Sequence, residues 1–86
     1  MPELSRFSGI IMRMFYAEHG PPHFHVAYAE FRAVIDIVTG ETITGSLPNH
    51  VGAQVREWYA LHKAELLENW NWARHQQPGR KIDPLE

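Results

Sequence analysis

The sequence predicts an α+β domain in which a four-stranded antiparallel β-meander, formed by the N-terminal half, packs against one long C-terminal amphipathic helix. Two patterns indicate this class. The first half contains short aliphatic and aromatic runs separated by turn residues, whereas the second half repeats apolar residues at spacings of three and four. With 86 residues, of which 44% are hydrophobic, the chain is long enough for one core. Residues 1–86 are therefore expected to form a single domain.

The first predicted strand covers residues 10–16. Arg13 marks its polar side, because successive side chains of a strand point to opposite faces of the sheet. The side chains expected to face the core are Ile10, Met12, Met14 and Tyr16. Those expected on the opposite, open face are Ile11, Arg13 and Phe15.

The rest of the meander follows from turn residues and alternation. Arg32 and Asp36 are separated by an even number of positions, so both are expected on the open face of their strand. Gly40 supplies the positive φ of a hairpin turn between two strand-like runs. The further strands expected are 24–28, 31–38 and 42–47.

One helix is predicted from Asn49 to His75, beginning after Pro48. As a single straight helix it would be about 40 Å long, whereas a six-residue strand spans about 20 Å. It must therefore overhang the sheet or bend near His62. An overhanging end that carries Trp70 and Trp72 would suit a homodimer contact. Residues 81–85 could return as a short edge strand that Pro84 ends.

Composition excludes several classes. The chain has no cysteine, so disulfides, thiolate metal sites and cysteine nucleophiles are ruled out. A formal charge of −2 gives no basic footprint of the kind that covers a nucleic-acid-binding protein. No run approaches the roughly 20 apolar residues that cross a bilayer. A cytoplasmic protein without membrane contact is expected.

Three of the six histidines lie within residues 19–25, in the run His-Gly-Pro-Pro-His-Phe-His. Two prolines stiffen this segment, and it leads directly into a strand. His23 and His25 are two positions apart and must project from the same face of that strand. This is the place in the chain where binding or catalysis is most expected.

Several segments together resemble a small bacterial domain-of-unknown-function family. The resemblance covers most of the chain and implies a gene that often lies beside that of a second small protein, in toxin–antitoxin-like pairs. It implies no established activity and therefore no catalytic residue. The segments that carry it are Gly9-Ile10, 13–16, Pro21-Pro22-His23-Phe24-His25, 45–48, 65–70 and 81–85.

The favoured interpretation is a protein-binding module that uses the open sheet face. Apolar and polar side chains are mixed on that face, as on many partner surfaces. The partner is expected to be a protein encoded nearby. The binding residues expected are Phe15, Tyr16, Arg32 and Asp36.

Three other interpretations stay open, and with them the question of whether the protein is an enzyme. His23 and His25 could act as an acid–base pair on RNA, with Arg13 stabilising the phosphorane and no metal required. Alternatively, His19, His23 and His25 could bind zinc or nickel, with Asp36 as another ligand within reach. In a purely structural role, His23 would hydrogen-bond a loop carbonyl and His25 would be a half-buried strand residue. Neither the acid–base interpretation nor the structural interpretation requires a cofactor.

Overall fold

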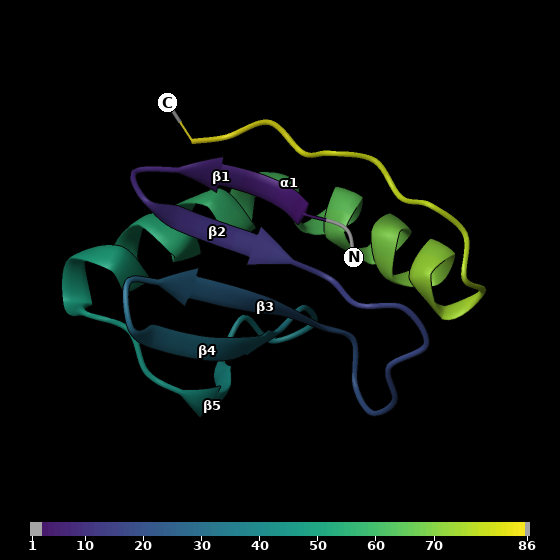
Figure 1. Ribbon diagram of the computed structural model, residues 1–86, viewed down its shortest axis with the longest axis horizontal. Coiled ribbons are helices and arrows are strands. Elements are labelled where there is room, and N and C mark those ends of the chain that lie inside the picture. The colour runs from purple at the N-terminus through teal and green to yellow at the C-terminus, as the bar shows by residue number, and fades with distance from the viewer. Residues whose placement is uncertain (1–2, 86) are drawn as a thin grey trace.

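The computed structural model describes residues 3–85. Five strands form one antiparallel sheet in chain order, and a helix lies across one face of it (Figure 1). Within residues 3–85 we find no helix that is both long and apolar enough to cross a membrane. The elements are β1 Glu3–Phe7, β2 Ile10–Arg13, β3 His23–Tyr28, β4 Phe31–Asp36, β5 Thr42–Gly45 and α1 Asn49–Arg74.

The predicted α+β class is confirmed, but the sheet has five strands and not four. The strand missing from the prediction is β1. Its buried apolar residues, Leu4 and Phe7, are three positions apart, a spacing that does not match strand alternation. A register shift between Glu3 and Ser5, where β1 pairs with β2, explains this spacing. An irregular strand of five residues therefore leaves no period-two signal in the sequence.

The face assignment of the first predicted strand is mostly confirmed. Ile10, Met12 and Met14 are buried in the core, as expected. Tyr16 is 42% exposed, so the prediction that it faces the core is wrong. The reason is that β2 ends at Arg13, and the chain turns at Ala17, which has a φ of 57°.

The helix bends, which is one of the two alternatives expected from its length. His62 interrupts its backbone with φ −124° and ψ 19°. Both halves of α1, before and after this bend, contribute buried residues. Trp58 lies at the centre of the core, with its ring centroid 5.8 Å from that of Phe24. The buried apolar residues of α1 are Val51, Val55, Trp58, Leu66, Trp70 and Ala73.

The C-terminal tail runs back along the β1 side of the sheet (Figure 1). Residues 81–85 do not form the predicted edge strand. Their backbone pairing with β1 is the bond from the amide of Ile82 to the carbonyl of Leu4, 2.8 Å. The indole nitrogen of Trp58 also donates to the carbonyl of Asp83, 2.9 Å away. The tail thus closes the core beside β1 by isolated contacts.

The two tryptophans proposed for a dimer contact already have partners within the chain. Trp70 is buried, 4% exposed, and packs against the ring of His23. The guanidinium of Arg80 lies 5.5 Å from the centre of the Trp72 ring. Trp70 is therefore buried within the chain and Trp72 is half-buried, and the homodimer stays a prediction.

Gly45 at the end of β5 offers a test of this packing. It has a φ of +78°, and an added Cβ would lie 2.1 Å from the carbonyl oxygen of Arg32. We expect Gly45→Ala to lower the free energy of unfolding by at least about 2 kcal/mol, because strain and a backbone clash combine. Urea denaturation measures this loss.

Gly20→Ala is the matched control. Gly20 also has a positive φ, +92°, but nothing lies within 4 Å of an added Cβ. We expect it to lose about 1 kcal/mol, the part that comes from backbone conformation alone. Equal losses in the two variants would contradict the close packing of β5 on β4.

Candidate functional site

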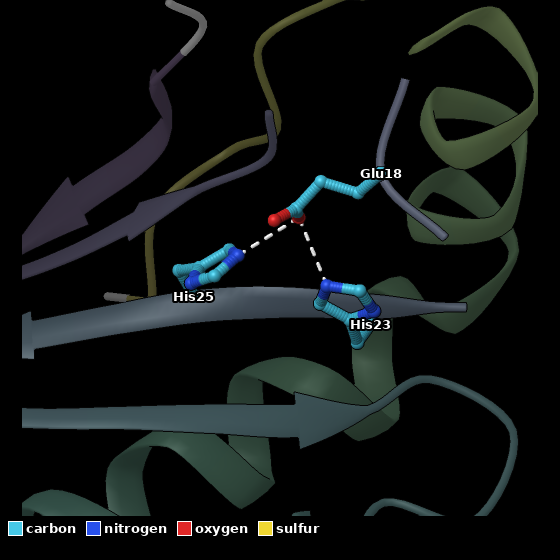
Figure 2. A group of neighbouring side chains, drawn as sticks. All are labelled: Glu18, His23 and His25. Carbon is cyan, nitrogen blue, oxygen red and sulfur yellow. Dashed lines mark hydrogen bonds and ion pairs between the residues drawn. The ribbon is translucent and has the colours of Figure 1, made fainter. Parts of the chain in front are cut away.

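The loop between β2 and β3 folds back over the start of β3. Its two ends are held by backbone hydrogen bonds to other elements. The amide of Ala17 donates to the carbonyl of Ala73 near the end of α1, 3.1 Å, and the amide of Ile37 donates to the carbonyl of Pro22, 2.9 Å. Figure 2 shows the consequence: the side chain of Glu18 reaches back over β3 toward its first histidines.

Glu18, His23 and His25 form a close group of side chains, named here the Glu18 cluster. The carboxylate oxygen Oε1 of Glu18 lies 2.9 Å from Nε2 of His23 and 2.9 Å from Nε2 of His25. The three atoms lie within 4.8 Å of one another. The Nε2 atom of each ring therefore points to the same carboxylate oxygen of Glu18 (Figure 2).

His23 is the buried member, with 8% of its surface exposed. Its Nδ1 lies 2.8 Å from the carbonyl oxygen of Pro21, and its ring centroid lies 5.0 Å from that of Trp70. His25 is half-buried, and Phe15 packs against it edge-on at 4.5 Å between centroids. The predicted bond from His23 to a loop carbonyl and the half-burial of His25 are thus confirmed.

The contacts of His23 require one more proton than a neutral ring carries. The carbonyl oxygen of Pro21 and an ionised Glu18 carboxylate both accept hydrogen bonds and donate none. A neutral imidazole has a single N–H and satisfies only one of them. The bonds are complete when His23 is doubly protonated or when the carboxyl group of Glu18 carries the proton. The Glu18 cluster therefore contains a position that a proton or another cation fills.

The other predicted site residues are distributed unevenly around this cluster. Arg13 is the register partner of His25 across β2 and β3, so it lies beside the cluster on the open face. His19 is exposed and lies outside the cluster; its neighbour Glu18 takes the place expected for it. Asp36 pairs in register with His23, but its Oδ1 accepts the amides of Val38 and Thr39. Its carboxylate therefore stabilises the turn after β4 and is not part of the cluster.

Glu18 was not among the residues singled out from the sequence. A glutamate five positions before His23 has no fixed spatial relation to a strand, because a loop that contains Gly20 and two prolines separates them. The feature of the sequence that could have pointed to Glu18 is the presence of an acidic residue in a short, stiff loop that ends in a histidine pair. The turn at Ala17, which points the loop back over the sheet, is visible only in the structure.

A groove of about 270 Å³ lies next to the cluster on the open face. His25 belongs to both, so the groove and the cluster are continuous. Two arginines line it, and there is no acidic side chain among the described residues of its wall. The residues that line it are Arg13, Phe15, His25, Val26, Ala27, Arg32, Ala33, Val34, Thr44 and Gly45. We name it the Arg13 groove.

A larger hollow of about 410 Å³ lies between the β4–β5 turn and the start of α1. Its charged lining residues are Glu41 and Arg56, of opposite sign. The hydroxyl of Tyr59 in its wall donates to the carbonyl of Ile37, 2.6 Å. At this hollow the Tyr59 hydroxyl thus joins α1 to the end of β4.

Replacement of each histidine tests the different roles derived above. We expect His23→Ala to lower the free energy of unfolding by about 1–3 kcal/mol, because buried acceptors lose their donor and Trp70 loses a packed ring. His25→Ala should lose less than half as much, and His19→Ala, an exposed control, should stay within about 0.5 kcal/mol of the parent. Urea denaturation with a chelator present measures all three, and equal losses for His23 and His25 would contradict the assigned burial.

Comparison with known proteins adds a family but no activity. No curated protein matches the chain. No solved structure matches it either. The match found is to the model of the family described as Domain of unknown function (DUF4160), over residues 9–71. This span contains β2 to β5, the histidine loop and most of α1. The chain therefore belongs to the DUF4160 domain family.

Proposed function

We propose that this protein is a cytoplasmic binding module that accepts an extended, acidic segment of a partner protein in the Arg13 groove. The observation that carries the proposal is the position of this groove, which combines two arginines with the adjoining free edge of β5. The family resemblance, with its toxin–antitoxin-like gene pairs, supports a partner encoded by the adjacent gene.

The charge of the groove favours an acidic occupant. Arg13 and Arg32 lie in its wall. The remaining lining is mainly apolar, with Phe15 and Val34 half-buried. A strand of alternating acidic and apolar residues matches this mixture, since its alternate side chains would meet one face of the sheet.

The two edge strands of the sheet differ in whether another segment of the chain lies against them. The edge at β1 receives the C-terminal tail, through the bond from Ile82 to Leu4. β5 is the other edge strand, and all of its residues are exposed. Ile43 within it is 46% exposed. An extended peptide can pair with such an edge through main-chain hydrogen bonds while its side chains enter a neighbouring groove.

A protein segment fits this surface better than RNA does. A nucleic-acid site of useful affinity neutralises several phosphates, on the order of 6–10 in well-studied cases. The groove offers two arginines, and Nη1 of Arg32 is already hydrogen-bonded to the carbonyls of Ala29 and Phe31.

Phe15→Asp tests the groove directly. A carboxylate placed in the same groove wall as the arginines should repel an acidic segment and remove an apolar contact, and we expect the affinity for the adjacent-gene product to fall at least about tenfold. Isothermal titration calorimetry with the two purified proteins measures this. Leu61→Asp is the matched control, because Leu61 is 66% exposed on α1, away from the groove, and its affinity should stay within about twofold.

Two results would overturn this proposal. One is binding of the adjacent-gene product that Phe15→Asp and Leu61→Asp weaken equally. The other is saturable binding of a decauridylate that Phe15→Asp abolishes, together with no measurable binding of the adjacent-gene product. The second result would assign the groove to single-stranded RNA.

A second candidate, metal-independent cleavage of RNA by His23 and His25, is favoured by one contact. Arg13 is the cross-strand partner of His25 and both line one groove, a pairing of residue types that acid–base catalysis on a phosphodiester uses. The shared bonds of both rings to Glu18 count against it, because they occupy the nitrogens that would transfer protons.

Replacement of His25 distinguishes this candidate from the binding module. For a ribonuclease, His25→Ala should lower the cleavage rate of a fluorescent RNA by about 100-fold or more, since general acid–base catalysis contributes about that much. For the binding module, no chelator-resistant cleavage should be measured in the parent or in His25→Ala, and partner affinity should fall less than for Phe15→Asp.

A further inference from the structure

We infer that the Glu18 cluster is a binding site for one divalent transition-metal ion, for which Zn²⁺ is the representative probe. The site consists of Nε2 of His23, Nε2 of His25 and a carboxylate oxygen of Glu18. This inference does not depend on the partner proposed above, because it rests on the geometry of three side chains.

Two of the three separations within the cluster, those from the Glu18 carboxylate to the histidine nitrogens, are close to those of a metal site, and all three ligand atoms lie within 4.8 Å of one another. In a tetrahedral zinc site with bonds of about 2.0–2.1 Å, neighbouring ligand atoms lie about 3.3 Å apart. Oε1 of Glu18 lies 2.9 Å from each histidine nitrogen. Each of these two separations would have to open by only about 0.4 Å to accept the ion. A loop side chain such as Glu18 can make that movement without moving β3.

The hydrogen bond between Nδ1 of His23 and the carbonyl of Pro21 is of the kind that fixes the ring orientation of metal-binding histidines. Such histidines usually donate their other ring N–H to a carbonyl or carboxylate, which leaves the metal-facing nitrogen with its lone pair. The bond is 2.8 Å long, and the ring is further fixed against Trp70. Edge contact with Phe15 restrains the ring of His25 in the same way.

A metal ion also resolves the hydrogen-bond balance of His23. With Nδ1–H donated to Pro21, a neutral His23 presents a lone pair to the carboxylate of Glu18, and two acceptors face each other at 2.9 Å. A cation between them makes both contacts favourable with the ring neutral. Histidine and carboxylate ligands, with no oxygen-rich shell, suit zinc, iron or nickel better than calcium or magnesium.

The site is open enough to admit an ion. The side chains of Glu18 and His25 are each 29% exposed, whereas that of His23 is 11% exposed. Three protein ligands with solvent on one side leave a coordination position for an exchangeable water.

The test is calorimetric titration of untagged, chelator-treated full-length protein with ZnCl₂. We expect one ion per chain, and an affinity that falls at least about tenfold in Glu18→Gln and in His25→Ala. Both replaced side chains are partly exposed, so these variants should keep the fold, which circular dichroism checks. His19→Ala and His75→Ala are matched controls, since both residues are exposed and outside the cluster; their affinity should stay within about twofold.

A second readout avoids dependence on the variants. Titration of the parent protein with Co²⁺ should give visible absorption bands of a four-coordinate site, and Zn²⁺ should displace them one for one. Absence of zinc binding tighter than about 100 µM would overturn the inference. Two further results would also overturn it, because both indicate adventitious surface binding only. One is a loss of zinc affinity in His19→Ala or His75→Ala that equals the loss in Glu18→Gln. The other is the binding of several zinc ions per chain, all of them weakly.

Discussion

The buried position of His23 at the start of β3 is the constraint from which the rest of the site follows. Its two ring nitrogens lie between the Pro21 carbonyl and the Glu18 carboxylate, and its ring packs on Trp70. A buried polar ring with both nitrogens engaged is costly to disrupt, because each lost partner leaves an unsatisfied group. The loop is therefore held against both the sheet and the end of α1. This restraint places Glu18 over the sheet, and it brings His25 into the same cluster.

Alternation along β3 connects this cluster to the open face. His23 and His25 project from the face opposite Phe24 and Val26, which enter the core. Phe24 and Val26 thus enter the core, while His23 and His25 supply the polar groups of the site, and His23 also contacts Trp70 of α1. Since His25 also lines the Arg13 groove, an occupant of the groove would lie next to the cluster. Binding at one position is expected to influence the other through this shared ring.

The regular parts of the fold could be predicted from the sequence, whereas the parts that depend on irregular backbone could not. Alternation and helical spacing gave β2 to β5 and α1, since both patterns are set by burial on one face. β1 was missed because its bulge hides the alternation. Helix length predicted either an overhang or a bend near His62, and the non-helical backbone at His62 shows the bend. Glu18 was missed because a turn with positive φ at Ala17 brings it back to the histidines, and residue type alone does not indicate such a turn.

The most direct test of the central claim is nitrogen-15 NMR of the histidine side chains, recorded for the chelator-treated protein and again with one equivalent of Zn²⁺. The geometry predicts that Nε2 of His23 and Nε2 of His25 shift to metal-bound values, while Nδ1 of His23 keeps its proton on the Pro21 carbonyl. The resonances of exposed histidines such as His19 should not move. Zinc-dependent shifts at His19 with none at His23 and His25 would contradict the account, and so would loss of the Nδ1 proton of His23.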